Sequence, residues 1–115
     1  MNRYARKVDS NHRPIEACFR SLGASVAHVS SDTTAGFPDL VVGYLGRTHL
    51  VEVKPDTQLQ RHMPSAAQQK WASGWKGAPV ALVRNVAQVA ELLAFWRKAR
   101  ALDDRAARLF AAASP

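Results

Sequence analysis

The chain has 115 residues, enough for one domain with a small core, and 47% of its residues are apolar. Its formal net charge of +7 and its pI near 10.3 indicate an anionic partner, of which nucleic-acid phosphate is the commonest. The single cysteine, Cys18, excludes a disulfide framework and a cysteine-based zinc site, and no apolar run approaches the roughly 20 residues of a membrane span.

A basic arm, a helix, a strand and a polar loop are expected in the first third of the chain. The arm covers residues 1–8, and the helix runs from residue 9 or 10 to residue 22, where Gly23 provides a stop. Residues 25–29 then predict a strand. Residues 30–36 are small and polar, so they form either an ordinary connector or a loop that contacts a substrate backbone.

Two runs, 36–42 and 50–55, are rich in β-branched and aliphatic residues, which predicts two strands. The short, glycine-containing connection at 43–47 favours an antiparallel hairpin. If the turn is centred on Leu45-Gly46, facing residues have numbers that sum to 91, and Asp39 faces Glu52. A turn centred one residue later pairs Asp39 with Lys54 and leaves Glu52 within diagonal reach.

Period-two alternation places Glu52 and Lys54 on one face of the second strand, with Val51 and Val53 on the other. Facing residues lie roughly 4.5 to 5.5 Å apart at Cβ, which is close enough for Asp39 and Glu52 to bind one divalent cation. Because two bare carboxylates repel each other, a hard cation between them is favoured. The alternative is the solvated face of an amphipathic edge strand, where a Glu-x-Lys pattern is common.

The second half of the chain predicts a polar loop at 58–64 and then a helix over 65–75. Trp71 and Trp75 share one face of this helix, and core packing is expected for both. A strand over 80–84 leads into a helix that begins near Val86 and turns apolar residues toward the core. Residues 102–113 predict an extra last helix with Asp103-Asp104 at its N-terminus, packed against its own domain or against a second subunit.

This ordered set of motifs resembles the PD-(D/E)XK nuclease superfamily, and more closely its VRR-Nuc branch of small standalone proteins, often from phages or bacteria. The resemblance spans about residues 6–96. It rests on Gly36-Phe37-Pro38-Asp39-Leu40 and Glu52-Val53-Lys54, on Asn11 before the first helix and Leu22-Gly23-Ala24 at its end, on Gln68 and Trp75, and on the strand-like run 77–83.

The resemblance implies an α/β fold with a restriction-endonuclease-like core, in which a central mixed β-sheet is flanked by α-helices. It also implies hydrolysis of DNA phosphodiester bonds with Mg²⁺ or Mn²⁺ by Asp39, Glu52, Lys54 and Gln68. Asp39, Glu52 and the carbonyl of Val53 are the implied metal ligands. Lys54 either positions or deprotonates the attacking water or neutralises charge on the phosphate. Without the resemblance, Gln68 is equally a solvated or capping residue.

One departure from the family pattern lies on the first helix. Relatives commonly carry a glutamate just before a branched aliphatic residue there, but in this chain Pro14 precedes Ile15 and Glu16 follows it. Residues 14 and 16 are about 200° apart on a helical wheel. Either the helix is rotated or shortened by Pro14, or the chain works without that carboxylate. Glu16 is kept as a candidate metal ligand, with a solvated helix residue as the alternative.

The expected partner is branched DNA. Standalone VRR-Nuc proteins resemble junction resolvases, and symmetric cutting of a four-way junction requires two active sites, hence a homodimer. Alternatives are a nuclease that acts on flaps, single strands or RNA, and a nucleic-acid-binding protein of the same fold with weak catalysis. The side chains expected to contact DNA are Arg6, Lys7, Asn11, Arg13, Arg47, Arg61 and Lys70.

The expected organisation is a basic arm at 1–8, a nuclease domain at 9–98 and a C-terminal helical extension at 99–115. The polar N-terminus argues against a signal peptide, and a lone cysteine fits a reducing compartment. We therefore expect an intracellular, cytoplasmic protein of a bacterial or phage-infected cell, with no membrane partner. The four histidines, His12, His28, His49 and His62, show no metal-ligand spacing.

Overall fold

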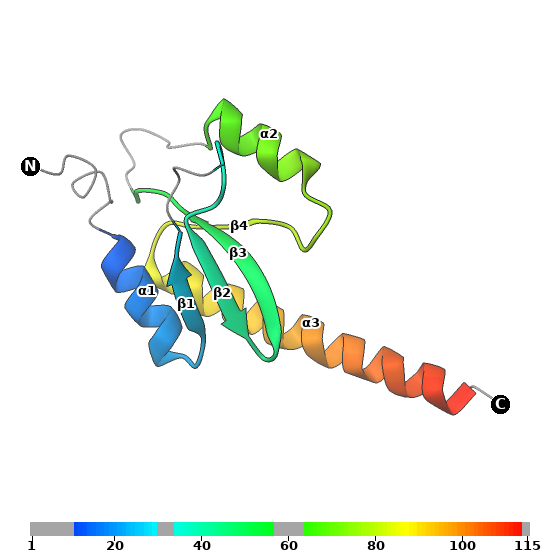
Figure 1. The fold of residues 1–115 in the computed structure, drawn as a ribbon. Coiled ribbons are helices and arrows are strands. Elements are labelled where there is room, and N and C mark those ends of the chain that lie inside the picture. Colours follow the sequence, from blue (N-terminus) through cyan, green and yellow to red (C-terminus); the bar gives the residue numbers. More distant parts are fainter. Residues whose placement is uncertain (1–10, 30–33, 57–63, 114–115) are drawn as a thin grey trace, which may run out of the picture.

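A computed structural model describes residues 11–29, 34–56 and 64–113 of the chain (Figure 1). The predicted basic arm, the first part of the 30–36 loop and most of the 58–64 loop lie outside these residues. Helices flank a mixed sheet, so the expected α/β class is confirmed. The elements in chain order are α1 (His12–Ser21), β1 (Ser25–His28), β2 (Leu40–Tyr44), β3 (Arg47–Val53), α2 (Ala66–Gly74), β4 (Ala81–Val83) and α3 (Val86–Ala113).

The β2–β3 hairpin has the first of the two registers considered from the sequence, with the turn centred on Leu45-Gly46. Its pairs run from Leu40 opposite Val51 to Tyr44 opposite Arg47, and the two numbers of each pair sum to 91. Leu45 and Gly46 form the turn with φ values of 51° and 76°. Positive φ at both central residues is typical of a type I′ turn, whose twist matches that of the flanking strands. The hairpin therefore carries Asp39 toward Glu52.

The sheet has the strand order β1-β2-β3-β4. β1 and β2 are antiparallel, as are β2 and β3, whereas β3 and β4 are parallel. Parallel neighbours need a crossover connection, and α2 lies in the one that joins β3 to β4. This connection places α2 near the end of β3 that carries Glu52 and near the neighbouring strand β4 (Figure 1).

One face of the sheet is the core. Leu40 and Val42 on β2 are fully buried there, together with Val51 on β3. These residues pack against α1 through its apolar stripe and against the first half of α3. The helix residues of the core are Ile15, Phe19, Val89 and Leu93, and the partly buried Cys18 packs against this core. Because Asp39 and Glu52 have the opposite parity, they belong to the other face.

The last helix differs from the prediction, because α3 is one continuous helix of 28 residues rather than two. Residues 98–101, Lys-Ala-Arg-Ala, are strong helix formers, and no glycine or proline interrupts 86–113. Asp103 and Asp104 therefore lie within the helix, not at its N-terminus. No helix in the described part of the chain, α3 included, is long and apolar enough to cross a membrane.

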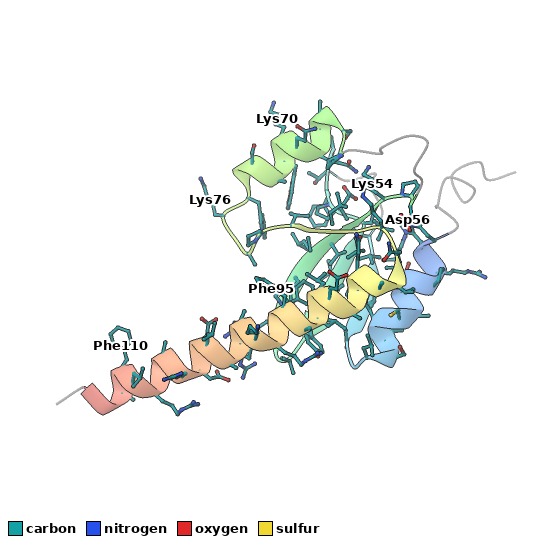
Figure 2. All side chains as sticks on the ribbon, turned by 180° about the vertical axis from the view of Figure 1, so that it is seen from behind. Lys54, Asp56, Lys70, Lys76, Phe95 and Phe110 are labelled. Carbon is teal, nitrogen blue, oxygen red and sulfur yellow. The ribbon has the colours of Figure 1, made fainter. Side chains whose placement is uncertain are left out.

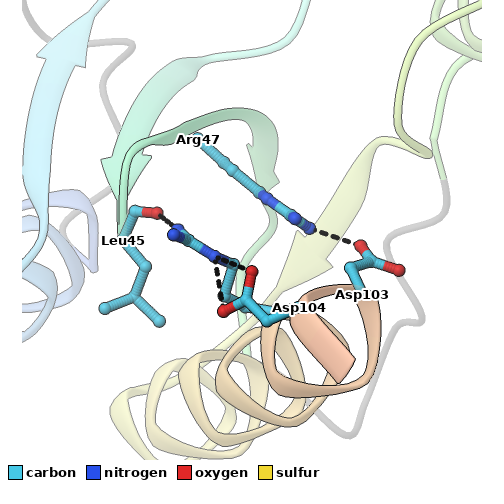
Figure 3. Close-up of polar contacts among 5 residues, drawn as sticks. Leu45, Arg47, Asp103 and Asp104 are labelled. Carbon is cyan, nitrogen blue, oxygen red and sulfur yellow. Dashed lines mark hydrogen bonds and ion pairs between the residues drawn. The ribbon is translucent and has the colours of Figure 1, made fainter. Parts of the chain in front are cut away.

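The aspartates of α3 bind the hairpin turn instead (Figure 3). Asp103 forms an ion pair with Arg47 at 2.6 Å, and Asp104 pairs with Arg100, whose guanidinium also donates to the carbonyl of Leu45. These contacts hold α3 against the end of the hairpin that is remote from Asp39. Beyond them, α3 extends past the sheet toward the C-terminus (Figure 1).

The prediction that Trp71 and Trp75 pack into the core is wrong. The two rings stack on each other with centroids 5.0 Å apart, and Trp71 meets the edge of Phe37 at the same distance. Trp75 is 44% exposed, and α2 has no fully buried residue. The tryptophans form a separate aromatic cluster with Phe37, beside the loop that leads to Asp39.

Candidate active site

Asp39 and Glu52 meet at the start of β2 and near the end of β3. One carboxylate oxygen of Asp39, Oδ2, accepts a hydrogen bond of 2.8 Å from the backbone N–H of Val53, which fixes the side chain across the hairpin. Glu52 is only 4% exposed, and its Oε1 is buried without a hydrogen-bond partner among the described residues. A buried carboxylate oxygen in that state is costly, so the site favours a ligand that can bind it.

The electrostatics of Glu52 reflect this placement. Burial, and then the hydrogen bond and negative charge of Asp39, raise the pKa of Glu52 to about 9, although the charge of Lys54 acts in the opposite direction. Two adjacent carboxylates in a desolvated site cannot both ionise comfortably. In the absence of a cation, Glu52 therefore keeps its proton at neutral pH, and a bound cation would displace that proton.

Lys54 follows Glu52 by two residues, which places both side chains on the same face of the strand. Its backbone N–H donates to the carbonyl of Val83 at 3.1 Å, which continues the pairing with β4. Its carbonyl accepts 2.9 Å from Nδ2 of Asn11, whose amide also donates to the carbonyl of Arg84 at 3.1 Å. Asn11 thus ties the start of α1 to the strand end that carries the lysine.

A pocket of about 140 Å³ opens beside Glu52, between α2 and the sheet. Gln68 lines it from α2, and Leu82, which pairs with Glu52, lines it from β4. The side chain of Gln68 also completes a capping box: its Oε1 accepts from the N–H of Ser65 at 2.8 Å. Gln68 therefore caps α2, and it also lines the pocket beside Glu52.

The pocket walls were not foreseen from the sequence. Pro38, Trp71, Val80, Ala81 and Leu82 make its surface largely apolar. Gly36 and Pro38 precede Asp39 in the sequence, but no local pattern predicts that the other wall residues lie beside them. These residues come together only through the β3–α2–β4 crossover. An apolar wall limits water access beside the two carboxylates.

Glu16 lies apart from Asp39 and Glu52. It is on α1, which covers the core face, and Glu16 Oε1 lies 3.6 Å from Arg20. Pro14 does not break the helix, because α1 begins at His12 and a proline in the first turn removes no helical hydrogen bond. The side chains that surround Glu16 are those of His12, Arg20 and His28.

The basic residues predicted to contact DNA fall in different places. Arg13 is exposed on α1 and Lys70 on α2, and Figure 2 shows Lys70 and Lys76 projecting from α2 and the segment after it. Arg47 is paired with Asp103 at the hairpin turn. That turn is five residues from Glu52, or about 17 Å along the strand. Arg6, Lys7 and Arg61 lie outside the described residues.

Comparison with known proteins agrees with this geometry. No protein-family model and no curated protein matches the chain. A solved structure of a VRR_NUC domain is similar, with a TM-score of 0.59 and 30% sequence identity over 70% of this chain and 87% of that one. The fold and its acidic pair define a nuclease of the PD-(D/E)XK type. Within that class, the chain belongs to the VRR-Nuc family.

Proposed function

We propose that the protein is a Mg²⁺- or Mn²⁺-dependent endonuclease that hydrolyses phosphodiester bonds in DNA. The observation that carries this proposal is the buried Glu52 beside Asp39, with a carboxylate oxygen that has no partner in the described part of the chain and a pKa of about 9. Oxygen donors of this kind suit a hard dication. We assign the cation to Asp39, Glu52 and the backbone carbonyl of Val53.

When bound, such a cation supplies Lewis-acid stabilisation of the phosphate and a lowered pKa for a bound water. The protein residues around it have separate tasks. Asp39 is held in place by the N–H of Val53, and Glu52 is held by burial. Lys54 positions or deprotonates the attacking water, or neutralises charge that develops on the phosphate. Gln68 orients groups from the pocket side while it caps α2.

We further propose that the substrate is branched DNA, with a four-way junction cut by a homodimer. Support for a dimer comes from α3, where Phe95, Leu102 and Leu109 are seven residues apart and 60 to 65% exposed. Residues at this spacing form one stripe along a helix, which is a common dimer contact. Phe95 and Phe110 project from α3 in Figure 2. The exposed Arg13, Lys70 and Lys76 suit DNA phosphates.

The organisation proposed for the chain follows from these assignments. The nuclease domain covers residues 9–98, and residues 1–8 act as a basic DNA-binding arm. Residues 99–115 form the C-terminal extension, which provides the dimer surface together with Phe95. The free Cys18 is compatible with work in the reducing cytoplasm. Both the arm and the dimer surface would add to binding without touching the acidic pair.

The test is cleavage of labelled four-way-junction, flap, duplex and single-stranded DNA, and of RNA, with Mg²⁺ or Mn²⁺. Asp39→Asn keeps a hydrogen-bond acceptor for Val53 but loses the charge, and Lys54→Met keeps the aliphatic stem. Both should lower the cleavage rate by about 100-fold or more while DNA binding persists. Glu91→Gln and Lys98→Met change exposed residues of α3 and serve as matched controls.

Paired, symmetric nicks in the junction that both active-site variants lose would establish the proposed function. Wild-type protein that binds these nucleic acids without cutting any of them would identify a binding protein of nuclease fold. Cutting confined to flaps, single strands or RNA would keep the catalytic centre and reject the junction. Unchanged rates in Asp39→Asn and Lys54→Met would show that the assigned centre is wrong.

The dimer is tested separately by sedimentation or light scattering. Leu102→Glu and Leu109→Glu place a charge in the apolar stripe of α3, and we expect them to yield monomers. Ala101→Glu adds the same charge about 100° around the helix and should leave the dimer intact. A monomeric wild type, or an equal effect of all three variants, would reject the stripe as the interface.

A further inference from the structure

Three ligand-type side chains, two of them on α1 and one at the end of β1, meet between this helix and the sheet. His12 and Glu16 are four residues apart on the helix and so share one face. His28 ends β1 and brings its imidazole to the same place. One ligand atom from each of the three residues lies within 4.8 Å of the others. The sequence alone does not indicate this group, because the separation between residues 12 and 28 matches no metal-ligand motif and the two imidazoles meet only in the folded chain.

This His12–Glu16–His28 cluster is separate from the acidic pair. His28 pairs with Leu40, so the two side chains point to the core face of the sheet, which α1 covers. Glu52 has the opposite parity on β3 and lines the pocket under α2. The two groups of potential ligands therefore lie on opposite faces of the sheet, and one ion cannot serve both.

A second observation also points to a ligand. His12 is only 5% exposed, and its Nδ1 is buried without a hydrogen-bond partner among residues 11–29, 34–56 and 64–113. The His12 and His28 rings meet edge to face with centroids 5.6 Å apart, and His28 is exposed to solvent. The cluster thus combines a desolvated imidazole with an open side through which a cation can enter. Coordination is a way for a buried imidazole to recover the interactions it loses on leaving water.

The positively charged side chain of Arg20 is close to this site and competes with a metal ion for Glu16. Arg20 lies 3.6 Å from Oε1 of Glu16, and its side chain is 55% exposed. An ion pair at this distance, with a half-exposed partner, contributes little to stability. Arg20 also donates a hydrogen bond of 3.4 Å to the carbonyl of Val26, so a cation that binds Glu16 needs to replace only the weak ion pair.

We infer that His12, Glu16 and His28 form a second metal site, which binds a transition-metal dication of the Zn²⁺ class. Two imidazoles and one carboxylate are a common ligand set for Zn²⁺, whereas Mg²⁺ prefers oxygen ligands and retains its waters. Tetrahedral ligands about 2.0 to 2.2 Å from an ion lie roughly 3.3 to 3.6 Å from one another. The three ligand atoms already lie within 4.8 Å of one another, so side-chain rotations can bring them to that separation. Water completes the tetrahedron.

Such an ion joins α1 to the edge strand β1. His12 directly follows Asn11, whose amide holds the carbonyls of Lys54 and Arg84. The ion therefore braces the same end of α1 that is tied to the strand of the catalytic lysine. Its role is to stabilise this part of the fold, and it does not depend on the chemistry at Asp39 and Glu52.

The experiment is a titration of the full chain with Co²⁺, whose visible absorption is much stronger in a tetrahedral site than in water, in a Glu52→Gln background that disables the acidic pair. Excess Mg²⁺ is present throughout. We expect one Co²⁺ per chain, displaced by Zn²⁺, and a rise in Tm with Zn²⁺. His28→Gln and Glu16→Gln change ligands that are not fully buried, so both variants should fold. Each should weaken binding at least tenfold, whereas the control His62→Gln should not.

The inference fails if the Glu52→Gln protein binds no Co²⁺ at micromolar concentration, or if His28→Gln and Glu16→Gln bind it as tightly as their parent. It also fails if His62→Gln has the larger effect. Unfolding in the presence of EDTA shows whether each variant is folded. Because the Glu52→Gln background carries no intact nuclease centre, failure here leaves the proposed nuclease function untouched, and the reverse also holds.

Discussion

The acidic pair makes the stability of the metal-free protein depend on pH in an unusual direction. Most buried carboxylates in proteins have partners that lower their pKa, so stability falls in acid. Here burial and Asp39 raise the pKa of Glu52 to about 9 from a reference value of 4.5. Glu52→Gln removes the titrating group and keeps its shape, so it isolates this effect.

The sign follows from proton linkage. Between pH 4.5 and 9 the folded protein keeps the Glu52 proton while the unfolded chain releases it. The contribution of protonated Glu52 to stability is complete below pH 4.5 and is lost as the pH rises through 9. The loss is at most about 1.4 kcal/mol per pH unit, because the folded protein holds at most one proton more than the unfolded chain. We expect roughly 1 to 2 kcal/mol of lost stability over two pH units near neutrality.

The assay is denaturant unfolding in EDTA at about pH 6, 7 and 8. The free energy of unfolding of the wild type, less that of Glu52→Gln, should fall with pH, and Glu91→Gln should behave as the wild type. Saturating Mn²⁺ should reverse the trend in the wild type alone, because cation binding displaces the proton and tightens with pH. A difference that stays constant from pH 6 to 8 would show that Glu52 titrates normally and would refute the reasoning.

Two further substitution pairs test the fold around the site. Gly36 has a φ of +81°, and a Cβ there would overlap the backbone oxygen of Ala67 on α2, so Gly36→Ala should displace α2, cost about 2 to 4 kcal/mol and reduce cleavage. The control is Gly23→Ala, at φ +96° with no atom within 4 Å, which should cost about 1 kcal/mol and leave cleavage intact. If both variants lose the same stability and the same cleavage activity, the clash at Gly36 is contradicted. Leu93→Ala in the core should cost about 2 to 5 kcal/mol in denaturant unfolding, whereas Val86→Ala, at a residue that is 47% exposed, should stay within about 0.5 kcal/mol. Comparable values would reject the assigned core.

Much of the acidic pair was predictable because it depends on local rules. A two-residue turn at Leu45-Gly46 fixes the register of the strands it joins, and the period of two fixes which side chains share a face. These two constraints are enough to bring Asp39 and Glu52 together from sequence alone. The core stripe of α1 and the capping of α2 by Ser65 follow equally local patterns.

The prediction failed where the outcome depends on packing between distant elements. Trp71 and Trp75 share a helix face as predicted, but α2 turns that face toward Phe37 instead of the core. Asp103 and Asp104 look like residues of a helix N-terminus until Arg47 and Arg100 are seen beside them. For the tryptophans the shared face was predicted and only the partner was wrong. For the aspartates the predicted helix start was itself wrong, because α3 continues through residues 98–101.

The sequence by itself determined the hairpin and the pair of carboxylates, because turn chemistry and alternation act over a few residues, while the class of fold followed from the resemblance to known nucleases. Only the tertiary structure decided what surrounds them. The desolvation that raises the pKa of Glu52, the apolar pocket under α2 and the meeting of His12 with His28 all require elements that are remote in the sequence to pack together. Burial and convergence are properties of that packing, and no local pattern encodes them.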